Sequence, residues 1–285
     1  MTLIDGKSIS AKVKDEIKSA ASDLAAKGVE PALAVILVGE DAASKTYVAS
    51  KEKACAACEI RSVAHRLSSD VSEAALLELI ENLNEDESID GILVQLPLPK
   101  HIDTNKILEK ISPQKDVDGF SAINVGKLTS GLADGFVPCT PLGVMRLLEE
   151  YGVQIAGKNA VVLGRSNIVG KPMASLLLNA DATVTITHSK TKNLKRLCAD
   201  ADILVAAVGK AHFVGADMIK QGAVVIDVGI NRGEDGKLRG DVDFDAVAPK
   251  CSLITPVPGG VGPMTIAMLL SNTIKSAKNR LRQRA

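Results

Sequence analysis

The chain contains the stretch Ala32-Leu33-Ala34-Val35-Ile36-Leu37-Val38, seven consecutive apolar residues that are followed by Gly39. A short run of this kind is typical of a strand buried on both faces of a parallel sheet. The next segment, residues 43–58, has a helical pattern and carries Tyr47 and Lys51. These two side chains are four positions apart, so they leave the same helix face one turn apart. Open α/β sheets bind ligands beyond the carboxyl ends of their strands, and the pair follows such an end.

The amine of Lys51 has two possible interpretations. It can serve as a base, nucleophile or proton relay, but only if its pKa falls from about 10.4 towards the working pH. A desolvated wall and a neighbouring hydrogen bond produce such a fall. Alternatively, Lys51 is a solvated lysine and Tyr47 a half-buried tyrosine on an ordinary helix. Spacing alone does not separate these interpretations.

The composition excludes several classes of protein. A length of 285 residues predicts about two domains, and 46% apolar residues suffice for two cores. The 34 basic and 34 acidic residues cancel, so no basic field is available for nucleic acid or an anionic membrane. No apolar run reaches the ~18 residues of a membrane span, and the first residues lack a signal-peptide layout. Five cysteines, an odd number, favour reduced thiols, so we expect a cytoplasmic protein.

Strands and helices alternate along the chain, which predicts mostly parallel α/β sheets. The expected strands are residues 32–38, 60–65, 89–95, 159–163, 183–187, 203–208, 223–228 and 252–254, and residues 231–243 carry hairpin signals. The expected helices are residues 8–27, 43–58, 70–83, 103–110, 140–151, 171–179, 194–198 and 265–282.

Capping signals and breaks in periodicity indicate where elements begin and domains end. The segment from Asp70 to Glu73 has capping-box-like spacing, Asp103 is a candidate N-cap, and Thr140 precedes a proline as an N-cap should. Residues 115–138 lack periodicity and are expected to connect the domains, and residues 256–263 form a rigid loop. We expect two α/β domains with a catalytic cleft between them. Residues 1–137 form the first, with the final helix 265–285 packing back on it, and residues 138–264 form the second, Rossmann-like domain.

The segment from Gly164 to Gly170 lies between a strand and a helix, where a phosphate can bind a helix N-terminus. It is not a standard dinucleotide fingerprint, because Ser166 and Val169 stand where the second and third glycines belong. It is not a P-loop either, because one residue is extra and Lys171 is followed by proline. A plain turn between strand and helix is the remaining alternative.

The second strand of this domain favours NADP over NAD. NAD sites usually carry an acidic residue about 20 residues beyond the first glycine, which binds the ribose 2′-hydroxyl. Here the strand ends in His188-Ser189-Lys190, without a carboxylate. Arg165 and Ser189 suit a 2′-phosphate dianion, whereas Lys190 could simply be solvated. Gly209 and Gly229, each just past a strand, would let the cofactor approach the backbone closely.

Other candidate motifs are weak. Cys55 and Cys58 have C-x-x-C spacing but lie within a helical pattern, and no second ligand pair follows at zinc spacing. Asp116 and Asp118 could bind Mg²⁺, yet two carboxylates without further ligands are insufficient. We therefore expect no metal site. The four histidines have no serine or cysteine partner in a local motif, which argues against a hydrolase triad.

Taken together, these motifs resemble those of the bifunctional methylenetetrahydrofolate dehydrogenase/methenyltetrahydrofolate cyclohydrolase family, over nearly the whole chain. The resemblance rests on five segments: Val38–Ser44 leading to Tyr47 and Lys51, Asp90–Pro99, Lys115–Phe120, Gly164-Arg165-Ser166, and Pro258–Pro263. It implies NADP-dependent oxidation of 5,10-methylenetetrahydrofolate to the 5,10-methenyl cation and hydrolysis of that cation to 10-formyltetrahydrofolate. It also implies a homodimer, formed through the nucleotide domain.

The resemblance further implies roles for individual residues. Lys51 would be the central catalytic residue and would activate water, while Tyr47 would orient the folate. Gln95 would hydrogen-bond Lys51, and Asp118 would accept hydrogen bonds from the amino and ring N–H groups of the pterin. Two further sets follow: Gly262 and Pro263 would border the folate, and Gly164, Arg165, Ser166, Ser189 and Ile230 would hold NADP.

One segment departs from the family pattern. Many members have His-Pro after the phenylalanine that corresponds to Phe120, whereas this chain has Ser121-Ala122. The departure keeps open a dehydrogenase that has lost the cyclohydrolase step. Two further alternatives are a non-catalytic NADP-binding module and a dehydrogenase for another small substrate, such as a shikimate-like acid.

Overall fold

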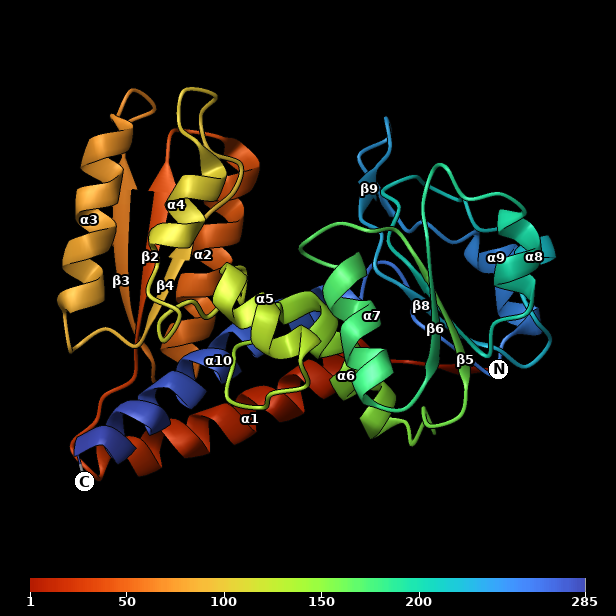
Figure 1. The fold of residues 1–285 in the computed structure, drawn as a ribbon, viewed down its shortest axis with the longest axis horizontal. Helices are drawn as coiled ribbons and strands as arrows, with labels where there is room; N and C mark the ends of the chain where they lie inside the picture. Colours follow the sequence, from red (N-terminus) through yellow and green to blue (C-terminus); the bar gives the residue numbers. More distant parts are fainter. Residues whose placement is uncertain (285) are drawn as a thin grey trace. The chain divides into compact units, whose positions relative to one another are not determined.

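The computed structural model describes residues 1–284, which divide into two compact units (Figure 1). The three-stranded unit comprises Lys12–Cys139 and the chain from Ile266 onward. The six-stranded unit comprises Met1–Ala11 and Thr140–Thr265. The chain therefore passes three times between the units within helices, in α1 (Gly6–Ala25), at the start of α6 (Cys139–Glu150) and in α10 (Val261–Arg284).

The three-stranded unit has the parallel order β3-β2-β4, formed by Arg61–Leu67, Ala32–Val38 and Gly91–Val94. All seven residues of β2 are buried because the strand lies at the centre of its sheet. On one face, Ala34 and Ile36 share a core with apolar residues of α3 (Glu73–Glu85) and α4 (Thr104–Lys110). Helix α2 (Ala42–Ala57) follows β2 and packs against β2 and β3.

The six-stranded unit has the parallel order β1-β11-β8-β7-β5-β6. Its strands are Thr2–Leu3, Leu253–Ile254, Val224–Asp227, Ile203–Ala206, Asn159–Leu163 and Thr183–Thr187. Its α-helices are α6 (Cys139–Glu150), α7 (Gly170–Asn179), α8 (Leu194–Ala199) and α9 (Phe244–Val247), and β9 (Asn231–Arg232) pairs with β10 (Leu238–Arg239) as an antiparallel hairpin. Strand order reverses between β5 and β7, and doubly wound sheets bind nucleotides outside the carboxyl ends of strands at such a point.

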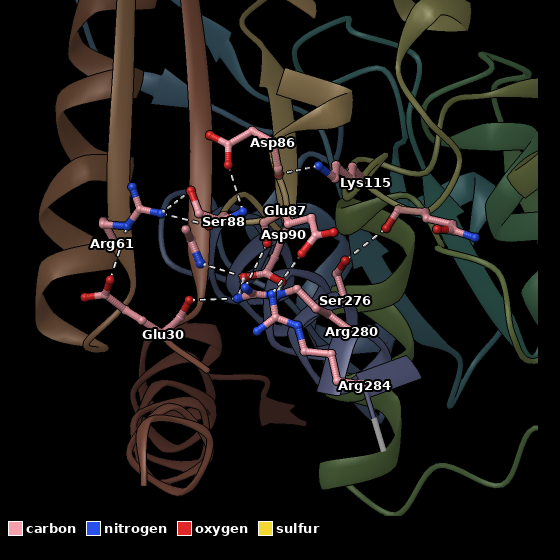
Figure 2. A network of polar contacts seen from close by, with 12 residues as sticks. Glu30, Arg61, Asp86, Glu87, Ser88, Asp90, Lys115, Ser276, Arg280 and Arg284 are labelled. Atoms are coloured by element: carbon pink, nitrogen blue, oxygen red, sulfur yellow. Dashed lines mark hydrogen bonds and ion pairs between the residues drawn. The ribbon is translucent and has the colours of Figure 1, made fainter. Parts of the chain in front are cut away.

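Helix α10 is tied to the three-stranded unit by a buried ion pair (Figure 2). Arg280 donates to both carboxylate oxygens of Asp90, at 2.8 and 2.9 Å, and to the carbonyls of Glu30 and Glu87. The Asp90 side chain is only 1% exposed, and its remaining donor is the backbone N–H of Ala32. The guanidinium supplies the positive charge that pairs with this buried carboxylate, so the position of α10 and the neutralisation of Asp90 depend on each other.

The two-domain α/β fold is confirmed, and most expected elements are present within one to three residues of their expected bounds. Four local expectations were wrong. Ser72, not Asp70, caps α3, because its hydroxyl accepts the N–H of Ala75. Helix α6 begins at Cys139, one residue before the expected cap.

The remaining two errors concern segments expected to lack helix. Residues 115–138 include helix α5 (Ala122–Thr129), which Ser121 caps. Helix α10 begins at Val261, so Gly262 and Pro263 lie in its first turn rather than in a loop. Strand β1 was not expected; it pairs with β11, and accordingly the first eleven residues cluster with the six-stranded unit.

Candidate functional site

Lys51 and Gln95 meet in the three-stranded unit. Asp41 caps α2 by accepting the N–H of Ser44 at 2.8 Å, which starts the helix soon after β2 ends. Lys51 lies in the third turn of α2 and donates to Oε1 of Gln95 at 2.8 Å, as expected. The other end of the Gln95 amide donates to the carbonyl of Leu96 at 2.8 Å, which turns its oxygen towards the amine.

The environment of Lys51 shifts the amine towards its neutral form. Burial lowers the pKa of Lys51, while Asp118 and, to a lesser extent, Cys139 oppose the change. Burial also raises the pKa of Asp118 to about 6, although the amine of Lys51 lowers it. Both groups are thus pushed towards their uncharged forms by the same apolar surroundings. An amine that readily loses its proton and is held by an amide oxygen can serve as a general base.

The turn that presents Asp118 is held by Asp116. The Asp116 carboxylate is buried and accepts the backbone N–H groups of Phe120 and Ser121 and the side-chain amide of Asn124. These three bonds use Asp116 to fix the turn, not to bind an ion. No cluster of three or more metal-ligating side chains occurs among residues 1–284.

The remaining expected residues of this unit have simpler settings. Tyr47 is 50% exposed, one turn before Lys51 on α2. Cys55 and Cys58 are free, buried thiols, and burial raises the pKa of Cys55 to about 12, so it is inert packing. Cys139 places its sulfur 3.7 Å from Oδ1 of Asp118. Sequence reasoning missed this thiol, because it lies 21 residues from Asp118 with no motif linking them.

In the six-stranded unit, the turn after β5 requires its glycines. Gly164 has a φ of +118°, and a Cβ there would lie 2.2 Å from the carbonyl oxygen of Ala207. A Cβ on Gly170, the first residue of α7, would lie 2.2 Å from the carbonyl oxygen of Gly164. The turn therefore packs tightly between β7 and α7, which brings the helix N-terminus close to the strand ends.

A cavity of about 490 Å³ lies beside this turn. It brings together Gly164, Arg165 and Ser189, as expected for one cofactor site. It does not include Ser166, whose hydroxyl instead accepts the N–H groups of Val169 and Gly170. The cavity also includes residues that sequence reasoning missed, among them Thr187, His188, Thr191, Val208, Lys210 and Phe213. Their sequence signal is their position: Thr187 ends β6, and the others follow β6 or β7.

Ile230 and Gly262 lie outside that cavity but close to each other. A Cβ on Gly262 would lie 3.8 Å from Cδ1 of Ile230, and Ile230 is 51% exposed. Pro263 follows in the first turn of α10, and its carbonyl accepts the hydroxyl of Ser10 at 2.9 Å. An expected cofactor residue and an expected folate residue are therefore neighbours in this unit.

Two family profiles match the chain. The tetrahydrofolate dehydrogenase/cyclohydrolase catalytic domain matches residues 4–118, and the NAD(P)-binding domain of the same family matches residues 138–281. The chain belongs to the tetrahydrofolate dehydrogenase/cyclohydrolase family. The chain thus carries both domains of this family, the catalytic domain and the NAD(P)-binding domain.

Relatives of the chain match it from end to end. A bifunctional FolD protein of Campylobacter hominis is 71% identical, with 99% of each chain covered. The crystal structure of the bifunctional enzyme FolD from Campylobacter jejuni is 58% identical, with a TM-score of 0.97, and covers 98% of this chain and 99% of its own. The Trypanosoma brucei FolD structure, complexed with NADP cofactor and inhibitor, is 42% identical, with a TM-score of 0.93, and covers 100% of this chain and 99% of its own.

More distant structures share only the fold. Shikimate dehydrogenase from Aquifex aeolicus is 13% identical, with a TM-score of 0.51. That level of similarity gives no support to a shikimate-like substrate.

Among residues 1–284, no helix combines the length and apolar character needed to cross a membrane.

Proposed function

We propose that this chain oxidises 5,10-methylenetetrahydrofolate to the 5,10-methenyl cation with NADP⁺ and hydrolyses that cation to 10-formyltetrahydrofolate. The observation that carries the proposal is the half-buried amine of Lys51, bonded to Gln95 and near Asp118, in a chain that matches both family domains. Relatives at 58–72% identity that carry the name bifunctional support both steps rather than the dehydrogenase step alone.

Lys51 acts in the hydrolytic step. Its lowered pKa makes the neutral amine accessible, and the positive charge of the methenyl substrate repels a second cation and lowers that pKa further. The neutral amine accepts a proton from water as the water attacks the C1 carbon. The hydroxyl group of the adduct then loses its proton as the C1–N5 bond breaks and N5 takes up a proton, which leaves the formyl group on N10. Gln95 holds the nitrogen in place through its Oε1, and it cannot itself carry the proton away.

Asp118 and Tyr47 bind and orient the folate. In its ionised form, the Asp118 carboxylate accepts hydrogen bonds from the amino and ring N–H groups of the pterin. The exposed Tyr47 ring offers an apolar face and a hydroxyl one turn from Lys51. Gly262 and Pro263 border the folate, and the lack of a side chain at Gly262 leaves room beside Ile230.

NADP supplies the hydride acceptor when it is bound, and the cavity beside Gly164 has the chemistry to hold it. Arg165 and Ser189 line that cavity and provide a cation and a hydroxyl for the 2′-phosphate. Lys210 adds a second cation in the same cavity. Gly164 and Ser166 shape the turn before α7, and Ile230 offers an exposed apolar surface.

The chain forms a cytoplasmic homodimer in this proposal. All five cysteines are free, which suits a reducing compartment. Strand β6 lies at the sheet edge, where β5 is its one neighbour in the described sheet, and Ile186 on β6 is 42% exposed. A second copy would cover that edge. Light scattering that gives a single-chain mass at micromolar concentration would reject the dimer.

One absorbance experiment tests the enzyme assignment. The protein is mixed with methylenetetrahydrofolate and either NADP⁺ or NAD⁺, and the methenyl band is followed. We expect the band to rise and then decay with NADP⁺, and preformed methenyltetrahydrofolate to decay without cofactor. A methenyl band that rises and does not decay would indicate dehydrogenase activity without cyclohydrolase activity. The absence of a band with either cofactor would reject the assignment.

A further inference from the structure

Asp241 is a buried carboxylate that no step of the proposed reaction uses. It follows the β9–β10 hairpin in the six-stranded unit and has no solvent exposure. Oδ2 accepts the backbone N–H groups of Val208 at 2.6 Å and Gly209 at 2.9 Å. Oδ1 accepts the backbone N–H of Lys210 and the side-chain amide of Asn231, both at 2.9 Å.

The three consecutive N–H groups belong to the loop that follows β7. Val208 and Lys210 line the cavity that also holds Gly164, Arg165 and Ser189. The same loop begins at Ala207, whose carbonyl lies against Gly164. Gly209 has a φ of +66°, so the loop makes a turn that the carboxylate closes from inside.

The fourth donor belongs to a different loop. Asn231 directly follows Ile230, the residue that lies beside Gly262. Gly229 completes the contact, because a Cβ there would lie 2.3 Å from Oδ1 of Asp241. Gly229 was expected to make room for the cofactor, whereas the structure shows that it makes room for this carboxylate.

We infer that Asp241 is a positioning residue for the cofactor: one carboxylate fixes both the 208–210 loop, which contributes Val208 and Lys210 to the cavity, and the 230–231 segment, which carries the proposed cofactor residue Ile230. This inference rests on the proposed function of that site. The carboxylate does not touch the cavity in its own right, because all four of its acceptor contacts go to protein donors. Asp227 supports it from behind, since Oδ1 of Asp227 accepts the backbone N–H of Asp241.

The test replaces the carboxylate by an amide of the same shape. In Asp241→Asn one oxygen becomes an NH₂ group that faces backbone N–H donors, so the loops lose their anchor. Loss of charge-assisted hydrogen bonds of this kind predicts a rise of about tenfold to a hundredfold in the Kd and KM for NADP. Hydrolysis of preformed methenyltetrahydrofolate, which depends on Lys51 in the other unit, should stay within about twofold, the expectation for sites that share no partners.

A matched control lies at the other end of β7. Asp202 precedes that strand and accepts the backbone N–H of Asn159 and the amine of Lys220, away from the cavity. Asp202→Asn makes the same chemical change in the same unit and should leave the Kd for NADP unchanged. If Asp241→Asn reduced the amount of folded protein, hydrolysis of methenyltetrahydrofolate and NADP-dependent oxidation would both fall. A change confined to the cofactor site would instead raise the Kd for NADP and leave the hydrolysis near its normal rate.

A second variant keeps the test decisive if Asp241→Asn does not fold. Asn231→Ala removes one donor from Asp241 and should raise the Kd for NADP about threefold to tenfold. The inference is overturned if Asp241→Asn and Asn231→Ala, or whichever of them folds, bind NADP as tightly as Asp202→Asn does. The Kd for NADP is measured without turnover. Failure of the folate assay would therefore reject the proposed function without changing the outcome of this binding measurement.

Discussion

At the scale of single residues, the proposed folate site rests on two titrating groups, Lys51 and Asp118. Lys51 and Asp118 oppose each other's pKa shifts, yet burial is the larger effect on each. The amine can therefore be neutral and the acid can still ionise near neutral pH. A base and a hydrogen-bond acceptor are then available at the same time.

Asp118 should give folate binding a pH dependence. Its pKa is raised from 3.8 to about 6, so the ionised form that accepts from the pterin is lost as pH falls through that value. We expect the KM for methylenetetrahydrofolate to rise about fourfold from pH 7.5 to pH 5.5, in step with the loss of the ionised fraction. Asp118→Asn should show a high KM with no such slope. A flat wild-type profile would contradict this.

The raised pKa of Asp118 also makes the folded protein less stable as pH rises, whereas the same rise in pH makes folate binding stronger. A raised acid pKa means that the stabilising contribution is fully present below the ordinary value of 3.8 and is lost as pH rises through about 6. Asp118→Asn should therefore be more stable than the wild type at pH 8, by on the order of 2 kcal/mol, and lose most of that advantage only as pH falls to about 4. Urea denaturation at the two pH values measures the difference.

Arg165 should determine the choice between cofactors. It lines the cavity with Ser189, and no acidic residue ends β6 to bind a 2′-hydroxyl. Arg165→Ala should weaken NADP by about tenfold or more and leave NAD nearly unchanged, because only NADP carries the 2′-phosphate. Calorimetric titration with both cofactors measures this. An equal loss for both would show that the arginine serves another group.

At the scale of elements, helix α10 holds the segment that carries Asp118. Asn272 is 3% exposed and donates to the carbonyls of Val117 at 2.8 Å and Val137 at 3.0 Å. One turn later, Ser276 donates to the carbonyl of Gln114 at 2.9 Å. The helix thus satisfies the backbone of a segment that has little regular structure of its own.

Asn272→Ala should disturb the folate site more than Ser276→Ala does. Asn272 bonds the residue immediately before Asp118, whereas Ser276 bonds a residue four positions before it. Asn272→Ala unpairs the carbonyl of Val117, which is buried, and should cost roughly 1–3 kcal/mol, whereas Ser276→Ala unpairs a part-buried carbonyl and should cost less. Only Asn272→Ala should also raise the KM for folate, by about fivefold. Equal KM values at equal stability loss would show that the helix acts only as support.

The elements also show what sequence can predict. Strand β2 was predicted to the residue, because a seven-residue apolar run has few alternatives beside a glycine. Helix α5 was missed, because its eight residues include a glycine and expose Ile123 and Val125, which blurs the helical period. The early start of α10 was missed because Gly262 and Pro263 are poor helix residues except in a first turn.

The residues of the site divide in the same way. Lys51 and Tyr47 lie on one helix face, so their spacing marked them in the sequence. Asp241 and Asn272 left no such signal, because most of their partners are backbone groups, 31–33 and 135–155 residues away respectively. Contacts of that kind depend on how loops meet, which local patterns do not encode.

At the scale of the whole molecule, stability depends on the ion pair between Arg280 and Asp90. Arg280→Met would leave a carboxylate that is 1% exposed without its cation, which should cost about 3 kcal/mol or more. Arg284→Met is the control, because its pair with Glu87 is exposed and should contribute less than about 1 kcal/mol. Denaturation midpoints compare the two. Equal midpoints would mean that the buried pair does not anchor α10.

The residues proposed for folate chemistry and those proposed for NADP binding belong largely to different units. Lys51, Gln95 and Asp118 belong to the three-stranded unit, whereas Gly164, Arg165 and Ser189 belong to the six-stranded unit. A change to the amine should therefore leave the cofactor residues as they are. This separation can be measured as the affinity for NADP of a variant that lacks the Lys51 amine.

The most direct measurement is the hydrolysis of preformed methenyltetrahydrofolate by Lys51→Met, together with its Kd for NADP. Methionine keeps the length and apolar body of the side chain but has no amine to accept a proton from water. We predict loss of the hydrolysis by at least about a hundredfold, with the Kd for NADP within about twofold of the wild type. Hydrolysis at the wild-type rate would contradict the role of Lys51 and with it the mechanism.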